Sequence, residues 1–162
     1  MCEAILAFVL LVVNLPGDTT PSTCPEVAYV QPGEMKVPGA SGVYDPQNGA
    51  IQIDATLPQD QRQATLAHEL VHYVLDQAGL MLYCHAEEAV AYWVGLQYVL
   101  RMLPHDSPLR RVVAAKIGDN PLRTVMFVSV MAERSCGPRA AHSPPSPLGS
   151  GSPSAASDAG VR

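Results

Sequence analysis

The segment from Pro58 to Gly79 limits the possible folds of this chain more than any other part of the sequence. Small and apolar residues recur in it at steps of three and four, namely Ala64, Ala67, Val71, Val74 and Ala78. This spacing is typical of the buried face of an α-helix. Proline suits the first turn of a helix, and glycine is common just beyond its end. The sequence therefore predicts a long helix over 58–78, whose apolar face needs a core to cover it.

Two short β-prone segments precede this helix. Residues 27–30 read Val-Ala-Tyr-Val, and apolar and polar positions alternate near the Asn48-Gly49 pair within residues 42–54. An Asn-Gly pair supplies the positive φ angles that a tight hairpin turn needs. We therefore expect a strand over 27–30 and a hairpin over 42–54.

Further helical segments follow the long helix. A very apolar stretch predicts a buried helix over about 86–103, which Pro104 ends. Ser107-Pro108 and Asn120-Pro121 each place a capping residue before a proline, and they predict two shorter helices that reach about Arg134. The order of elements predicts an α+β fold, a small sheet packed on a helical layer.

Composition limits the domain organisation and excludes several classes of protein. The 162 residues are 48% hydrophobic and carry a net charge of −5, which argues against a disordered chain and against a nucleic-acid-binding protein. Residues 137–162 are mostly Ser, Pro, Gly and Ala and predict a disordered tail. We therefore expect one folded domain over 25–136, preceded by an apolar segment over 1–24.

The apolar run from Ala4 to Val13 allows two interpretations. It is ten residues long, too short to span a bilayer. No basic residue precedes it and no small-residue cleavage site follows it, which favours a buried first helix or strand over a secretion signal. We expect a cytoplasmic protein without a transmembrane span; export or membrane tethering through residues 4–13 is the alternative.

The four cysteines, Cys2, Cys24, Cys84 and Cys136, include no CxxC pair. They predict neither a zinc ribbon nor a redox motif, and we expect free buried thiols. A Cys24–Cys84 bridge is the alternative for an exported protein.

The predicted helix over 58–78 carries the sequence His68-Glu69-Leu70-Val71-His72. Histidines four residues apart lie on one face of a helix, where both imidazoles can bind one metal ion. Glu69 beside them can accept a proton from a metal-bound water. This HExxH arrangement is typical of zinc hydrolases, so we expect Zn²⁺ at His68 and His72, with Glu69 as the general base.

A catalytic zinc needs a third protein ligand and an open position for water. Asp76 is unsuitable, because three ligands at four-residue steps spread over about 12 Å of helix axis. We expect Glu88 as the third ligand, since a carboxylate in an apolar helix is costly to bury without a cation. Glu87 points about 100° around the helix and is expected in solvent. His85 is the alternative ligand.

The HExxH motif followed by Glu88 resembles the gluzincin pattern, and the hairpin before it resembles the small ImmA/IrrE-like metallopeptidase domains. The resemblance covers about residues 25–103. It implies a minimal zincin-like fold, a zinc ion and a peptide or protein substrate. Larger gluzincins orient the first histidine with an acidic residue where this chain has Tyr92, so Asp76 becomes a candidate for that role.

Two functions remain open. The first is a zinc-dependent hydrolase, most simply a metallopeptidase, with Tyr83, Tyr92, His85 and His105 as candidates for stabilising the oxyanion. The second is a non-catalytic, zinc-stabilised module that binds a partner. The presence of Glu69 favours the hydrolase, because a structural zinc site needs no base.

Overall fold

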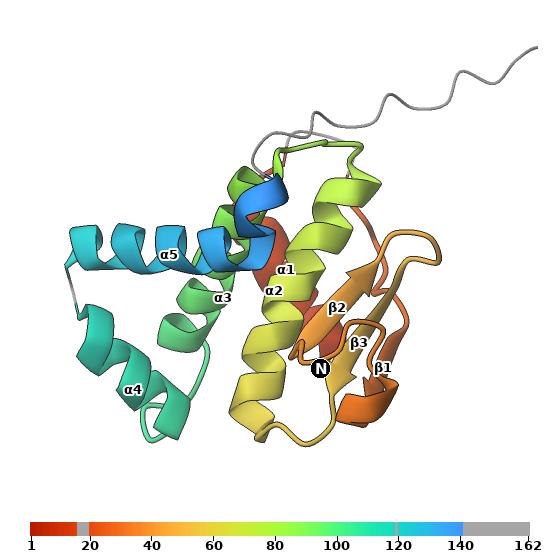
Figure 1. Ribbon diagram of the computed structural model, residues 1–162. Helices are drawn as coiled ribbons and strands as arrows, with labels where there is room; N and C mark the ends of the chain where they lie inside the picture. The colour runs from red at the N-terminus through yellow and green to blue at the C-terminus, as the bar shows by residue number, and fades with distance from the viewer. Residues whose placement is uncertain (16–19, 119, 141–162) are drawn as a thin grey trace, which may run out of the picture.

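A computed structural model describes residues 1–15, 20–118 and 120–140. Within these residues the chain forms a three-stranded sheet and five α-helices, which confirms the predicted α+β fold. Figure 1 shows α2 between the sheet on one side and α3, α4 and α5 on the other. In chain order the elements are α1 (Cys2–Val13), β1 (Val27–Val30), the 3-10 turn η2 (Pro32–Glu34), β2 (Gly42–Asp45), β3 (Ala50–Asp54), α2 (Gln59–Gln77), α3 (Cys84–Arg101), α4 (Pro108–Ile117) and α5 (Pro121–Ala140).

The sheet has β3 at its centre. β1 pairs with β3 in parallel, and β2 pairs with it antiparallel as the predicted hairpin, so β2 is an edge strand. Of the Asn48-Gly49 pair only Gly49 has a positive φ, 69°, because the connection between β2 and β3 is longer than a two-residue turn. Asn48 instead accepts a hydrogen bond from the backbone N–H of Ala50.

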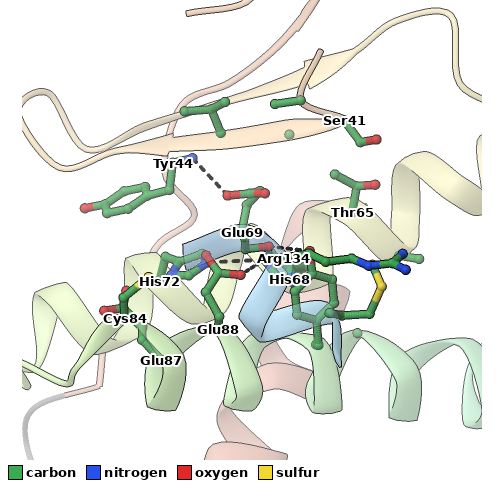
Figure 2. A pocket seen from close by; sticks show the side chains of 18 of the residues that line it. Ser41, Tyr44, Thr65, His68, Glu69, His72, Cys84, Glu87, Glu88 and Arg134 are labelled. Carbon is green, nitrogen blue, oxygen red and sulfur yellow. Dashed lines mark hydrogen bonds and ion pairs between the residues drawn. The ribbon is translucent and has the colours of Figure 1, made fainter. Parts of the chain in front are cut away.

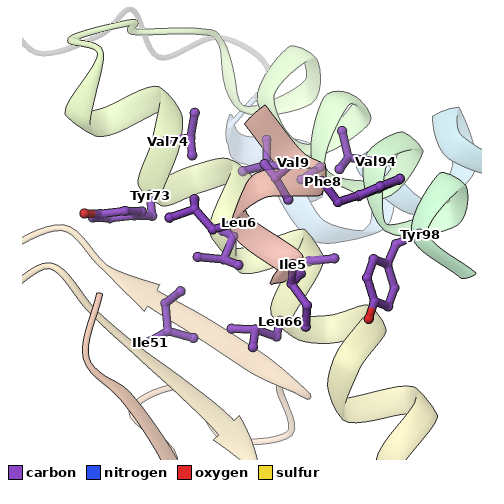
Figure 3. Packing of buried hydrophobic residues seen from close by; sticks show 14 of the residues in the cluster. Ile5, Leu6, Phe8, Val9, Ile51, Leu66, Tyr73, Val74, Val94 and Tyr98 are labelled. Carbon is purple, nitrogen blue, oxygen red and sulfur yellow. The ribbon is translucent and has the colours of Figure 1, made fainter. Parts of the chain in front are cut away.

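One hydrophobic core joins the sheet to α1, α2 and α3 (Figure 3). Figure 3 shows Ile5 and Leu6 of α1 near Ile51 of β3 and Leu66 of α2. One face of the apolar run at residues 4–13 thus packs into the core, through Ile5, Leu6, Phe8 and Val9, while Leu11 is exposed. None of the helices in the described ranges is long and apolar enough to cross a membrane.

The helices lie close to their predicted positions. α2 starts directly after Pro58 and ends shortly before Gly79, whose φ of 65° turns the chain away. The Ser107 hydroxyl caps α4 by accepting the backbone N–H of Arg110. α5 continues to Ala140, past the predicted end near Arg134, so the first residues of the predicted tail are helical. The rest of that tail, from residue 141 on, lies outside the described residues.

All four cysteines form disulfides. Cys2 of α1 is bonded to Cys24, and Cys84 at the start of α3 is bonded to Cys136 of α5. The expectation of free thiols is therefore wrong, and so is the alternative Cys24–Cys84 bridge. Four cysteines allow three pairings, and here the packing of α5 on α3 decides between them.

Candidate metal centre

The packing of α2 against α3 brings three potential metal ligands together (Figure 2). The Nε2 atoms of His68 and His72 are 3.2 Å apart. The carboxylate oxygens of Glu88 lie 3.4 Å from Nε2 of His68 and 3.7 Å from Nε2 of His72. One ligand atom from each residue lies within 4.8 Å of the other two. The three side chains predicted to bind zinc can therefore reach one ion.

The Glu88 carboxylate has the properties of a metal ligand. Burial raises the pKa of Glu88, but the interaction with His68 and the charge of His72 lower it by more. The pKa therefore lies below the ordinary value, and the group is ionised. Its Oε2 atom is buried and has no hydrogen-bond partner among the described residues. A buried anionic oxygen is costly unless a cation compensates it. Two imidazoles and one carboxylate are also a common ligand set of catalytic zinc.

His72 is oriented by Glu87. Nδ1 of the His72 ring lies 2.7 Å from Oε1 of Glu87, so the ring donates a hydrogen bond there and Nε2 keeps its lone pair for a metal. Burial lowers the pKa of His72, but the bond to Glu87 and the nearby carboxylates outweigh it and raise the pKa. The expectation that Glu87 points into solvent is wrong, because its side chain is only 31% exposed and is bound to the ring.

Glu69 lies between the histidines and the sheet. It is 7% exposed, and its Oε2 atom accepts the backbone N–H of Tyr44 in β2 at 2.9 Å. Burial raises the pKa of Glu69, although the two histidines lower it in part, and the net pKa is above the ordinary value. A buried carboxyl with a raised pKa is well suited to accept a proton near neutral pH.

Glycine at position 42 lets β2 approach Glu69. A Cβ atom at Gly42 would lie 2.9 Å from Oε1 and Cγ of Glu69 and 2.5 Å from Cγ2 of Thr65. These distances are shorter than normal carbon contacts, so any side chain there would displace the carboxylate. Gly42 and the Tyr44 backbone thus determine where the Glu69 carboxylate lies.

Asp76 does not orient a histidine, although the sequence made it a candidate for orienting His68. Its Oδ2 atom accepts a hydrogen bond from the Tyr44 hydroxyl at 2.7 Å. No hydrogen bond joins it to His68 or His72 in the described part of the chain. Burial and the bond to Asp76 both raise the pKa of Tyr44. Asp76 therefore anchors β2 to the end of α2.

A cavity of about 1220 Å³ adjoins this centre. Tyr92 lines it, with its ring centroid 4.5 Å from that of His68 and its hydroxyl 2.8 Å from Oγ of Ser135. The other candidates for stabilising an oxyanion, Tyr83, His85 and His105, are not among the residues that line the cavity.

Helix α5 forms a wall of the same cavity through Phe127, Met131, Arg134 and Ser135. Sequence reasoning missed this role. The only signal available was the spacing of these four positions, which places them on one face of a helix.

Comparison with known proteins identifies a family for the central part of the chain. Residues 28–95 match the model of the IrrE N-terminal-like domain, a peptidase family. A search of curated proteins and a search of solved structures each found no match. The matched segment runs from β1 into α3 and contains the HExxH motif and Glu88, whereas α1, α4 and α5 lie outside it. The resemblance to ImmA/IrrE-like metallopeptidases is confirmed over these residues.

Proposed function

We propose that this chain, whose residues 28–95 form an IrrE N-terminal-like domain of the M78 peptidases, is a zinc-dependent metallopeptidase. The observation that carries the proposal is the convergence of His68, His72 and Glu88, together with the buried Oε2 atom of Glu88, which accepts no hydrogen bond from any described residue and faces Nε2 of His68 at 3.4 Å. These three side chains would hold the zinc ion and leave a position for water. When bound, zinc lowers the pKa of such a water and polarises a substrate carbonyl.

Glu69 is the proposed general base. It accepts a proton from the attacking water and returns it to the leaving amine of the peptide. Burial raises the pKa of Glu69, which is the direction that favours uptake of a proton from water. The hydrogen bond from the Tyr44 backbone holds the carboxylate beside the histidines.

The substrate we propose is a peptide or a segment of a protein. The cavity next to the histidines has a volume of about 1220 Å³, which exceeds the roughly 300–1,000 Å³ of pockets for small molecules. Residues of β2 and of each of the helices α2, α3, α4 and α5 line it, so several consecutive residues of a peptide can contact the protein at once.

The alternative is a zinc-stabilised binding module without catalysis. Structural zinc sites have four protein ligands, whereas in the described part of the chain three residues offer ligand atoms to this site. A structural site also has no use for a buried carboxyl such as Glu69 next to the ligands. Both observations favour the hydrolase.

Metal analysis and peptide cleavage test the proposal together. We expect about one zinc per chain in the wild type and in Glu69→Gln, and much less in Glu88→Ala. Glu69→Gln should leave a peptide library uncut, because the base is lost while the ligands remain. Glu133→Ala, a change at an exposed position of α5, is the control and should match the wild type. The proposal would be contradicted if Glu69→Gln cleaved peptides as well as the wild type, or if Glu88→Ala bound as much zinc as the wild type.

We further propose that the protein works in an oxidising compartment. Two disulfides are present, and such bonds form and persist mainly outside the reducing cytosol. This favours an exported protein over the cytoplasmic location expected from the sequence, with residues 4–13 retained in the fold, since Cys2 next to them forms one of the two bonds. Titration of free thiols in protein isolated from its native source under non-reducing conditions would test it, with none expected.

A further inference from the structure

The cavity beside the histidines contains several carboxylates and one strong cation. Its four carboxylates, those of Glu69, Asp76, Glu87 and Glu88, all contact other groups of the protein as described above. Arg134 is the one arginine or lysine among the described residues that line the cavity. It is exposed, and no ion pair joins it to another described residue. The guanidinium is therefore available for a ligand.

Arg134 lines the same cavity as the proposed zinc ligands. The next residue, Ser135, is hydrogen-bonded to Tyr92, whose ring lies against His68. Figure 2 shows the Arg134 side chain beside His68, with its guanidinium directed away from His72 and Glu87. Arg134 thus borders the cavity that a substrate would occupy, at some remove from the metal centre.

The disulfide between α3 and α5 fixes this arrangement. Cys136 follows Arg134 by two residues, and its partner Cys84 precedes Glu88 by four residues on α3. The helix that carries the free cation is therefore covalently joined to the helix that carries the carboxylate ligand. Arg134 is held at the cavity instead of being on a loosely packed helix.

The lining that α3, α4 and α5 give to the cavity is largely apolar. It includes Leu96, Val113, Phe127 and Met131, and Met131 lies one helical turn before Arg134 on α5. An apolar wall beside a cation suits a ligand that carries a carboxylate next to an apolar group. A peptide offers this combination at an apolar C-terminal residue or at an acidic side chain beside an apolar one.

We propose that Arg134 binds a carboxylate of the substrate and makes the enzyme selective for peptides that carry one at this position. A guanidinium and a carboxylate form two parallel charge-assisted hydrogen bonds, which an uncharged amide cannot replace. The inference rests on the proposed function, because it assumes a peptide in this cavity. Arg134 lies outside the segment that matches the family, so the matched domain does not supply this selectivity.

Binding to the zinc-loaded Glu69→Gln protein tests the inference without hydrolysis of the ligand. Three probes are compared: N-acetyl-Ala-Ala-Phe with a free carboxylate, the same peptide as its C-terminal amide, and N-acetyl-Ala-Glu-Phe amide. We expect at least one of the two carboxylate-bearing probes to bind about tenfold more tightly than the uncharged amide. The tighter of the two identifies the source of the carboxylate, the C-terminus or a side chain.

Two variants in the same background separate Arg134 from general charge effects. Arg134→Gln should abolish the preference for a carboxylate, whereas Arg123→Gln should keep it, because Arg123 is on the same helix but does not line the cavity. The inference is overturned if no probe binds, if the amide binds as tightly as both acids, or if Arg134→Gln weakens all three equally. A preference for a carboxylate that persists in Arg134→Gln would arise from the metal centre, and it would also overturn the inference.

Wild-type protein distinguishes this inference from the proposed function. It is assayed for bound zinc and for cleavage of the three probes and a peptide library. Failure of both assays contradicts the metallopeptidase, while the effect of Arg134→Gln on binding still decides whether this residue recognises a carboxylate.

Discussion

Glu87 and Glu88, neighbours at the start of α3, contact the two different nitrogens of the His72 ring. Oε1 of Glu87 lies 2.7 Å from Nδ1, and Oε1 of Glu88 lies 3.7 Å from Nε2. A carboxylate on Nδ1 sets the orientation of the ring and leaves the lone pair of Nε2 for a metal. Glu87 thus positions the histidine, and Glu88 faces the proposed metal site.

Replacement of Glu87 should weaken zinc binding without removing a ligand. We expect Glu87→Ala to lower the zinc affinity about 10- to 100-fold, because the His72 ring loses the acceptor that orients it. Glu87→Gln retains a side-chain carbonyl acceptor and should recover most of the affinity. Competition with a chromophoric chelator measures both, with Glu133→Ala as the control. Unchanged affinity in Glu87→Ala would show that the ring needs no such partner.

Gly42→Ala should reduce catalysis while leaving zinc in place. The new Cβ would collide with Glu69 and Thr65, so the carboxylate must move, whereas the three atoms nearest to it include none of the proposed zinc ligands. We expect kcat to fall about tenfold or more and the free energy of unfolding to drop by about 1–3 kcal/mol. Gly33→Ala is the matched control, since nothing lies within 4 Å of a Cβ there. Normal kcat in Gly42→Ala would mean that the position of Glu69 is not critical.

The sequence predicts the local parts of this site well. The four-residue spacing of His68 and His72 fixes their common face on α2, and the cost of burying a carboxylate pointed to Glu88. The expectation for Glu87 is wrong because the angle of about 100° between neighbouring residues on a helix does not limit access to the site to one of them. An imidazole has two nitrogens on different sides of its ring, so both neighbours can reach it.

The parts that could not be predicted depend on contacts between distant segments. The pairing of Cys84 with Cys136 and the placement of Arg134 at the cavity both follow from the packing of α5 on α3. Local sequence patterns predict that α5 is a helix, but they do not indicate which other helix it packs against. The same holds for Asp76, whose partner Tyr44 is 32 positions away in the sequence.

The two disulfides should differ in their effect on the metal centre. Removing Cys84–Cys136 by a double change to serine frees the start of α3, so we expect weaker zinc binding and a loss of about 2–4 kcal/mol in the free energy of unfolding. The double serine change at Cys2 and Cys24 should reduce stability by a similar amount and leave the zinc affinity unchanged, because neither cysteine is on α2 or α3, the helices that carry the proposed ligands. Chelator competition and urea unfolding measure the two quantities. Equal effects of both variants on zinc would contradict a local role for Cys84–Cys136.

Asp60 links the start of α2 to the start of α4 and should make stability depend on pH. Its Oδ2 atom accepts hydrogen bonds from the Ser107 hydroxyl at 2.9 Å and from the Leu109 backbone N–H at 3.1 Å. Burial raises the pKa of Asp60, but these bonds outweigh it, and the pKa in the folded protein is below the ordinary value. The carboxylate therefore stabilises the fold above the unfolded pKa of about 3.9, and this contribution is lost as the pH falls through the folded pKa.

Asp60→Asn should accordingly lower the free energy of unfolding by about 1 kcal/mol at pH 7, with a difference that shrinks towards zero in strong acid. Urea unfolding of both proteins at pH 7 and at a series of acidic pH values gives the comparison. Asp106→Asn is the control, because Asp106 is exposed and makes no hydrogen bond or ion pair within the described ranges. A stability difference between wild type and Asp60→Asn that is constant with pH would show that the charge of Asp60 does not contribute.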